Sequence, residues 1–225
     1  MDGETLALSD DLYELAYGLW WPKYDRICRP SIAADLPDLV AFAGMCPQNR
    51  VVVQAGGNVG VWPKNYAQFF KQVYTYEPDK WNWECLRRNV TEPNVFTFNA
   101  ALGAAPGRVS IQAVIDNCGA NFGVPGDEVE VVTIDALELQ TCDLIQLDIE
   151  GFELEALKGA ERTLLRCSPL VILEQKGHTE RYGTTDSQVN AWLKQRDYQI
   201  ITRRHRDTVF KRVGGHDRPT RVEWK

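Results

Sequence analysis

The chain has 225 residues, a formal net charge of -6 at pH 7 and a pI near 5.2. This length allows one domain with a substantial core and a small appendage, and the acidic balance makes nucleic acid an unlikely partner, because phosphate groups bind basic surfaces. No apolar run is long enough to span a membrane, and the acidic residues near the start do not fit a signal peptide. We therefore expect a cytoplasmic protein that does not bind membranes.

Residues 1–50 precede the first predicted strand and are expected to form a helical cap or lid. Their apolar spacing predicts one helix over about 12–19 and a second that begins near residue 36. In one interpretation this segment packs on the sheet edge. In the alternative, part of it, including Trp20 and Trp21, covers a substrate pocket.

From residue 51 to residue 212 strands and helices alternate, which is typical of a doubly wound, mostly parallel α/β sheet. The predicted strands lie near 51–55, 73–77, 94–98, 143–148 and 169–174. The predicted helices lie near 61–71, 79–89, 153–166 and 187–196. Two final strands, near 198–202 and 208–211, have so short a link that they must be antiparallel, which gives seven strands in all.

Two regions depart from this alternation. Residues 108–134 show β character around a loop rich in glycine and asparagine, 116–126, which predicts a hairpin or sheet extension with a mobile loop over the pocket. Residues 213–225 are polar and are predicted to form a flexible tail.

The six cysteines are widely scattered and form no CxxC pair. Their spacing indicates neither a zinc site nor a disulfide framework. We expect reduced and mostly buried thiols.

The stretch VVVQAGGNVG, residues 51–60, is a buried strand that breaks into glycines just before a helix. Gly56, Gly57 and Gly60 let the backbone approach a ligand without a Cβ in the way. Their register matches neither the dinucleotide fingerprint nor a phosphate loop. Downstream, Glu77 stands at the end of the second strand, where an acid can accept both ribose hydroxyls of an adenosine group.

Three acids, Asp148, Glu150 and Glu153, surround Gly151 at the carboxyl end of the fourth strand. Capping of the next helix explains Glu153 alone. Because the three carboxylates repel one another, we expect a cation among them: a sulfonium, a divalent metal or a basic side chain.

In this order the motifs resemble those of the FkbM-type family of class I S-adenosylmethionine-dependent methyltransferases. The family patterns Gly-Ala-Asn-x-Gly, Phe-Glu-Pro and Asp-x-Glu-Gly-x-Glu are matched by Gly56-Gly57-Asn58-Val59-Gly60, by Tyr76-Glu77-Pro78 and by Asp148-Ile149-Glu150-Gly151-Phe152-Glu153. The matches cover about residues 51–175. The resemblance implies a Rossmann-like methyltransferase sheet over 51–212 that binds S-adenosylmethionine.

The resemblance also implies the cofactor contacts. Gly56, Asn58 and Gly60 would line the methionine part, Glu77 would hold the ribose, Asn99 and Ala100 would lie near the adenine, and Asp148 would flank the methyl group. Gln54, Gly57 and Pro78 complete the predicted set. Gln54 stands where most such enzymes carry an acid, so it offers the cofactor's ammonium no charge. A catalytically degenerate binding or assembly module is therefore an alternative function.

The expected reaction, again by resemblance, is O-methylation of a hydroxyl on a glycan or small molecule, with N-methylation as the nearest alternative.

Glu174, Lys176 and His178 alternate after the fifth strand and would point to the same pocket mouth as Asp148 and Glu150. We predict a catalytic set of His178, Asp148, Glu150 and Lys176. His178 is the candidate base, because an imidazole titrates near neutrality; the alternative is a surface histidine. In a second hypothesis Asp148, Glu150 or Glu153, together with Glu174, binds Mg²⁺ and acidifies the hydroxyl.

Overall fold

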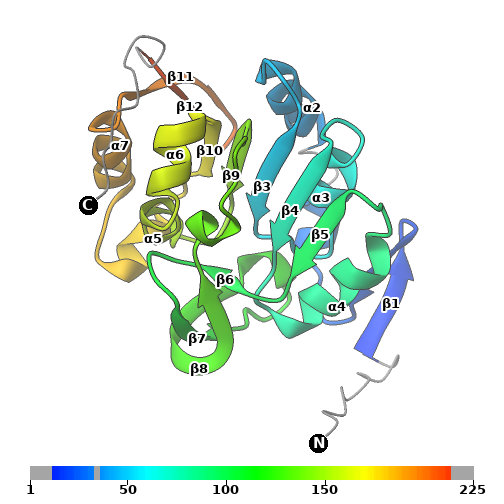
Figure 1. Cartoon of the computed structure of the whole chain (residues 1–225). Coiled ribbons are helices and arrows are strands. Elements are labelled where there is room, and N and C mark those ends of the chain that lie inside the picture. Colours follow the sequence, from blue (N-terminus) through cyan, green and yellow to red (C-terminus); the bar gives the residue numbers. More distant parts are fainter. Residues whose placement is uncertain (1–11, 33–35, 214–225) are drawn as a thin grey trace, which may run out of the picture.

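The computed structural model describes residues 12–32 and 36–213, and its centre is a seven-stranded sheet (Figure 1). The strand order is β11-β12-β10-β9-β3-β4-β5. In chain order these strands are β3 (Val51–Ala55), β4 (Gln72–Tyr76), β5 (Val95–Phe98), β9 (Leu144–Leu147), β10 (Leu170–Glu174), β11 (Tyr198–Arg204) and β12 (Asp207–Arg212). The predicted seven-stranded sheet is confirmed.

Five neighbouring strands run parallel, from β5 through β4, β3 and β9 to β10. Strand β12 pairs antiparallel with both β10 and β11, as the short final link required. From β3, the next strands of the sheet, β4 and β5, follow one another on one side, whereas β9 lies on the other side of β3. The sheet therefore has a topological switch point between β3 and β9, where open α/β sheets bind ligands.

Alternate residues of β3 belong to two core clusters, with Val51, Val53 and Ala55 in one and Val52 in the other. The first cluster includes side chains of α5 (Glu153–Lys158), α6 (Glu161–Cys167) and α7 (Asp186–Lys194), which lie together on the left of Figure 1. The second includes side chains of α2 (Leu36–Met45) and α3 (Val61–Tyr66). Because successive side chains of a strand point to opposite faces, both faces of the sheet carry helices.

A second, three-stranded sheet has the order β6-β8-β7 and forms the green hairpin at the bottom of Figure 1. Strands β7 (Gly107–Gln112) and β8 (Phe122–Val132) pair antiparallel, and β6 (Ala101–Leu102) runs parallel to β8. The short 3₁₀ helix η3 (Cys118–Ala120) lies in the turn of the hairpin. This confirms the predicted hairpin, although part of the predicted loop belongs to β8.

The predicted helix over residues 12–19 is wrong. The chain forms a hairpin there, with β1 (Tyr13–Ala16) antiparallel to β2 (Leu19–Pro22). Tyr17 and Gly18 both have positive φ, 52° and 76°, as the primed turns of tight hairpins require. The side chain of Asn89, at the end of α4 (Lys80–Asn89), accepts a hydrogen bond from the Trp20 amide at 2.7 Å and donates one to its carbonyl at 2.9 Å. A distant contact thus holds the hairpin.

The other predicted helices agree with the structure apart from their ends. The helix expected near residue 36 is α2, after the short α1 (Cys28–Ile32). The helix expected over 153–166 is divided at Gly159, where a Cβ would lie 2.0 Å from the Gly103 carbonyl oxygen. The predicted tail, after residue 213, lies outside the described residues. Among the helices of the described ranges, none combines the length and the apolar character that a membrane crossing needs.

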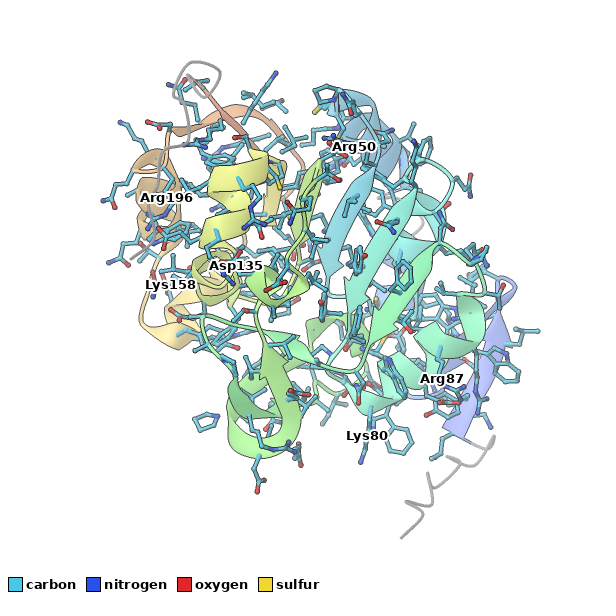
Figure 2. The ribbon with its side chains drawn as sticks, viewed as in Figure 1. Arg50, Lys80, Arg87, Asp135, Lys158 and Arg196 are labelled. Atoms are coloured by element: carbon cyan, nitrogen blue, oxygen red, sulfur yellow. The ribbon has the colours of Figure 1, made fainter. Side chains whose placement is uncertain are left out.

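Basic side chains lie around the periphery of the molecule, as the labelled Arg50, Lys80, Arg87, Lys158 and Arg196 show in Figure 2. Four of these cations lie 2.6–3.1 Å from an acid, in the pairs Arg50–Asp143, Arg87–Glu84, Lys158–Glu155 and Arg196–Glu161. The positive charge of these residues is therefore dispersed and offset.

Candidate active site

A cavity of about 670 Å³ opens where the carboxyl ends of four neighbouring strands meet. Its lining includes Gly56 after β3, Glu77 after β4, Asp148 after β9 and Glu174 at the end of β10. The cavity thus lies at the switch point of the sheet, and its volume is within the range of roughly 300–1,000 Å³ that small-molecule sites occupy.

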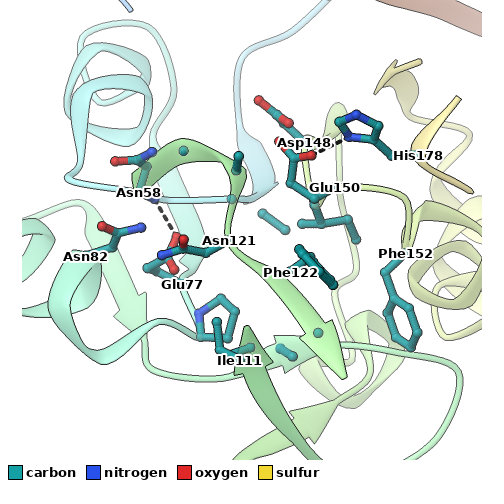
Figure 3. A pocket seen from close by; sticks show the side chains of 18 of the residues that line it. Asn58, Glu77, Asn82, Ile111, Asn121, Phe122, Asp148, Glu150, Phe152 and His178 are labelled. Atoms are coloured by element: carbon teal, nitrogen blue, oxygen red, sulfur yellow. Dashed lines mark hydrogen bonds and ion pairs between the residues drawn. The ribbon is translucent and has the colours of Figure 1, made fainter. Parts of the chain in front are cut away.

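Two segments outside the sheet complete the cavity. Ile27, Cys28 and Ser31 line it from the N-terminal part, and Ile111 and Phe122 line it from the β7–β8 hairpin. Figure 3 shows Glu77 with Asn58, Asn82 and Asn121 on one side, and Asp148 with Glu150 and His178 on the other. Trp20 and Trp21, the expected lid residues, do not line the cavity, and the later residues 27–31 take that place.

Glu77 is buried, with 5% of its surface exposed, and backbone N–H groups hold its carboxylate. Its Oε2 accepts the amide of Asn58 at 2.7 Å and its Oε1 accepts the amide of Asp79 at 2.8 Å. Burial and the nearby Asp79 charge raise the pKa of Glu77 to about 8. Because each carboxylate oxygen has a second lone pair, both can still accept a ligand hydroxyl.

The glycine turn after β3 packs directly on the end of β9. Gly56 has φ of 82°, and a Cβ there would lie 1.9 Å from the carbonyl oxygen of Asp148. The Asp148 amide also donates to the Ala55 carbonyl at 3.1 Å. A side chain at position 56 would therefore push apart the two strand ends that form the cavity floor.

On the opposite side, carboxylate oxygens of Asp148, Glu150 and Glu174 lie within 4.8 Å of one another. The ammonium of Lys176 lies 3.0 Å from Glu150 Oε1 and 2.5 Å from Glu174 Oε2. Lys176 supplies the cation that the clustered acids require. Its burial opposes the charged form, but the three carboxylates outweigh burial and raise the pKa of Lys176.

Asp148 and Glu174 differ in their protonation. Burial first, and then the facing Glu174 carboxylate, raise the pKa of Asp148 well above its ordinary value. Burial also disfavours the charge on Glu174, but its hydrogen bond with Asp148 and the Lys176 charge outweigh this and lower the pKa of Glu174. Within the pair, a proton is therefore favoured on Asp148 over Glu174.

His178 and Glu150 form a hydrogen-bonded pair, drawn as a dashed line in Figure 3, between the imidazole Nδ1 and the carboxylate Oε2. Glu150 has φ of 57° and only 4% exposure, so its turn directs the carboxylate inward. At Gly151, with φ of 108°, a Cβ would lie 2.3 Å from the His178 carbonyl oxygen, so glycine allows the His178 segment to approach. Because a carboxylate only accepts, Nδ1 donates, and in the neutral imidazole Nε2 then keeps its lone pair.

Most of the predicted site residues meet at this cavity. The predicted residues in its lining are Gly56, Asn58, Glu77, Pro78, Ala100, Asp148, Glu150, Glu174, Lys176 and His178. The predicted residues outside it are Gln54, Gly57, Gly60, Asn99 and Glu153.

Gln54 is buried beneath the glycine turn, and its amide is bound within the fold. Its Nε2 donates to the carbonyls of Gly56 at 2.9 Å and Ala55 at 3.2 Å, while its Oε1 accepts the Thr75 hydroxyl at 2.5 Å. The geometry gives no support to the predicted contact between Gln54 and a cofactor ammonium. The alternation along β3 places this side chain on the same face as Val52.

Asn99 and Glu153 hold backbone next to the cavity. The Asn99 side chain donates to the carbonyls of Glu77 at 2.9 Å and Pro78 at 3.2 Å. Glu153 Oε1 accepts the amides of Ile149 and Gly151, each at 3.2 Å, and burial raises the pKa of Glu153 to about 7. Glu153 therefore braces the turn that carries Glu150.

Several lining residues were not predicted individually. Asn121 and Phe122 fall within the loop expected over the pocket, so the sequence pointed to their segment. Asn82 donates to the Cys118 carbonyl at 2.7 Å, and its buried Oδ1 has no protein partner. Cys28 and Cys118 also line the cavity, and their spacing gave no signal because the two cysteines are distant in the chain.

The sheet order, the antiparallel final strands and the cavity at the switch point define a Rossmann-like methyltransferase fold. A sequence model of the family described as "Methyltransferase FkbM domain" matches residues 54–200, which is more than half of the chain. The chain therefore belongs to the FkbM methyltransferase family. A comparison with curated proteins found no significant match.

Two solved structures share the fold. Methyltransferase FkbM from Methylobacillus flagellatus is 22% identical with a TM-score of 0.51, and the match covers 72% of this chain and 43% of that one. Trm5b from Pyrococcus abyssi is 12% identical with a TM-score of 0.50, and the match covers 89% of this chain and 56% of that one. The chain thus spans about half the length of these proteins.

Proposed function

We propose that this protein uses S-adenosylmethionine to methylate a hydroxyl group of a glycan or small molecule, with His178 as the general base. The observation that carries the proposal is the Glu150–His178 pair, which lies at the same cavity as a buried carboxylate suited to ribose hydroxyls. The net charge of -6 supports a small acceptor over nucleic acid.

The cavity residues fit the cofactor at its nucleoside end. Glu77 has two acceptor oxygens fixed by backbone amides, and the unpartnered Oδ1 of Asn82 lies in the same part of the lining. Gly56 and Asn58 supply the turn beside it. When bound, S-adenosylmethionine supplies an electrophilic methyl group on a sulfonium.

At the other end, the chain's own residues position the acceptor and accept its proton. The free Nε2 of His178 takes the hydroxyl proton, and the Glu150 carboxylate stabilises the imidazolium that forms. Lys176 keeps Glu150 and Glu174 in place through its two ion pairs. Asp148 lies beside them with its Oδ1 buried and unpartnered in the lining.

Three alternatives remain to be compared with this proposal: Mg²⁺ catalysis, a catalytically degenerate module and N-methylation. The Mg²⁺ hypothesis now requires a metal to displace Lys176, whose ammonium already lies between Glu150 and Glu174. The degenerate module rested on the aromatic-rich first fifty residues and on Gln54, and Gln54 does not line the cavity. N-methylation is the second candidate, and it differs because a neutral amine needs no base before transfer.

The test is methyl transfer from isotope-labelled S-adenosylmethionine to hydroxylated small molecules and glycans. We expect His178→Ala to lower the transfer rate by about 10²–10⁴-fold, because the hydroxyl loses its base. The control His205→Ala should keep the wild-type rate, since His205 pairs with Asp38 at 2.6 Å and does not line the cavity. A wild-type rate in His178→Ala, or methyl groups found only on nitrogen, would refute the proposal.

A further inference from the structure

A group of three buried metal-binding side chains lies at the edge of the cavity, away from the acidic cluster. Asp25 and Cys28 come from the N-terminal segment and Cys118 comes from η3. One ligand atom from each lies within 4.8 Å of the others, and their exposures are 0%, 8% and 1%. Residues far apart in the chain thus place two thiols and a carboxylate around one point.

Backbone hydrogen bonds hold this arrangement together. Asp25 Oδ1 accepts the amides of Cys28 and Cys118, each at 3.1 Å, and Asp25 Oδ2 accepts the amide of Arg29 at 2.8 Å. The amides of Arg26 and Ile27 donate to the Asp116 carbonyl at 2.8 and 3.0 Å. The two segments therefore meet in a defined register.

Two neighbours of the thiols make room for an ion and offer a further ligand. At Gly119 a Cβ would lie 2.8 Å from Cys28 Sγ, so a larger residue would crowd the thiol. The Asn58 amide contacts both cysteines, with Nδ2 3.4 Å from Cys28 Sγ and Oδ1 3.6 Å from Cys118 Sγ. Asn58 Oδ1, which also accepts the Val59 amide at 2.6 Å, is thus a candidate fourth ligand.

We propose that Asp25, Cys28 and Cys118 bind one Zn²⁺ ion, with Asn58 Oδ1 completing a tetrahedral site. Zinc–sulfur bonds of about 2.3 Å place two thiolates roughly 3.8 Å apart, which is within the present spacing of the ligand atoms. Two sulfur donors favour zinc over Mg²⁺ or Ca²⁺. Binding turns two thiols into thiolates and releases two protons to the buffer, so the ion, two thiolates and one carboxylate carry a net charge of -1.

The position of this site gives the ion a structural role. Cys28 and Cys118 line the cavity from two different segments of the chain, and Asn58 donates its backbone amide to Glu77. A bound ion would clamp the N-terminal segment to η3 and fix Asn58 beside the nucleoside end. The site does not depend on the proposed reaction, because the ligands are separate from the acidic cluster.

The test is Co²⁺ titration of the reduced, metal-free full-length protein, followed by absorption. We expect one equivalent of Co²⁺ to give a thiolate-to-cobalt charge-transfer band that Zn²⁺ then removes. Cys28→Ser and Cys118→Ser should each weaken the band, since one thiolate remains, and the double variant should lose it. Each of these variants, and Asp25→Asn, should weaken binding by at least about tenfold. Asp25→Asn keeps an acceptor oxygen for the amides of Cys28 and Cys118 but loses the acceptor of the Arg29 amide, so circular dichroism is used to check that this variant is folded.

Cys167→Ser is the matched control, because this half-buried cysteine lies at the end of α6, outside the group of three. X-ray absorption of the zinc-loaded wild-type protein needs no variant and should show two sulfur neighbours at about 2.3 Å. No charge-transfer band, or a band that survives both cysteine substitutions, would overturn the proposal. So would a reduced protein that binds no Co²⁺ but oxidises to a Cys28–Cys118 disulfide.

Discussion

The two ends of the cavity hold buried carboxylates in opposite ways. At one end Glu77 is bound by backbone N–H groups, and burial raises its pKa to about 8. At the other end Glu150 and Glu174 are bound by the side chains of Lys176 and His178. Backbone amides give a fixed and weakly charged acceptor, whereas side-chain cations keep carboxylates ionised. The first arrangement suits binding of neutral hydroxyls, and the second suits proton transfer.

Among the tests of this comparison, the largest effect should be on the methyl-transfer rate, when the Glu150 carboxylate at the charged end of the cavity is neutralised. Glu150→Gln keeps an acceptor for His178 Nδ1 but removes the charge that stabilises the imidazolium, so we expect the methyl-transfer rate to fall by about 10²-fold or more. Affinity for S-adenosylhomocysteine, measured by calorimetry, should stay near wild type. The control is Glu180→Gln, an exposed residue of η5 (His178–Tyr182). Equal rates in the two variants would contradict the assigned role.

Removing the Lys176 ammonium, which lies at the same end of the cavity as Glu150, should reduce the stability of the fold. Lys176→Met leaves the clustered carboxylates with only the more distant guanidinium groups of Arg181, 3.6 Å from Glu150, and Arg206, 3.8 Å from Glu174. We therefore expect the free energy of unfolding in urea at neutral pH to fall by about 3 kcal/mol. Lys158→Met, which breaks an exposed pair with Glu155 at 2.6 Å, should cost less than about 1 kcal/mol. Similar losses for the two variants would show that Lys176 does not hold the acidic cluster together.

A smaller effect should appear at the nucleoside end as pH changes. The pKa of Glu77 is raised from 4.5 to about 8, so the folded state binds more protons than the unfolded state between these values. The contribution of Glu77 to stability therefore falls as pH rises through this window. Binding that requires the ionised carboxylate should strengthen with pH, by up to about tenfold per pH unit below 8, and should release a proton.

Calorimetry with S-adenosylhomocysteine in buffers of different ionisation enthalpy measures this release. Glu77→Gln should weaken binding and abolish its pH dependence. Glu153→Gln is the matched control, because burial also raises the pKa of Glu153, to about 7, but Glu153 does not line the cavity. Its substitution should change the pH dependence of stability and leave that of binding intact. Binding independent of pH in the wild type would count against the nucleoside role of Glu77.

The smallest effect is expected at Gln54, where the sequence comparison predicts that an acid tightens cofactor binding. Gln54→Glu keeps an oxygen for the Thr75 hydroxyl, and a protonated carboxyl can still donate to the Gly56 carbonyl. Because position 54 does not face the cavity, affinity for S-adenosylhomocysteine should change by less than about threefold. Clearly tighter binding by Gln54→Glu would show that the side chain at position 54 contacts the cofactor.

The sequence predicted the features that local patterns determine. The valines of β3, the glycine turn and Glu77 all lie within short stretches, and so does the acidic turn that carries Asp148 and Glu150. The orientation of Gln54 could also be predicted from the sequence, because side chains alternate between the two faces of a strand and Gln54 therefore shares the face of Val52 and not that of Val53. These motifs sufficed to predict the sheet and to bring His178 and Glu150 to one pocket mouth.

The rest depends on contacts between distant segments. The β1–β2 hairpin has the apolar spacing of a helix, but positive φ at Tyr17 and Gly18 and the Asn89 contact decide its structure. The meeting of Cys28 and Cys118 follows from how the N-terminal segment packs on the β7–β8 hairpin. No spacing rule along the chain encodes such a meeting.

The switch point between β3 and β9 has a consequence for how the chain assembles. Val52 pairs with Val73 of β4 on one side and with Leu144 of β9 on the other. The seam between β3 and β4 therefore joins residues that are close in the sequence, whereas the seam between β3 and β9 joins residues that are far apart in the sequence. Seams of high sequence separation form slowly. The cavity floor, Gly56 against Asp148, belongs to the slow seam. A chain in which β3 has not paired with β9 therefore has no floor for the cavity, so ligand binding there requires this pairing.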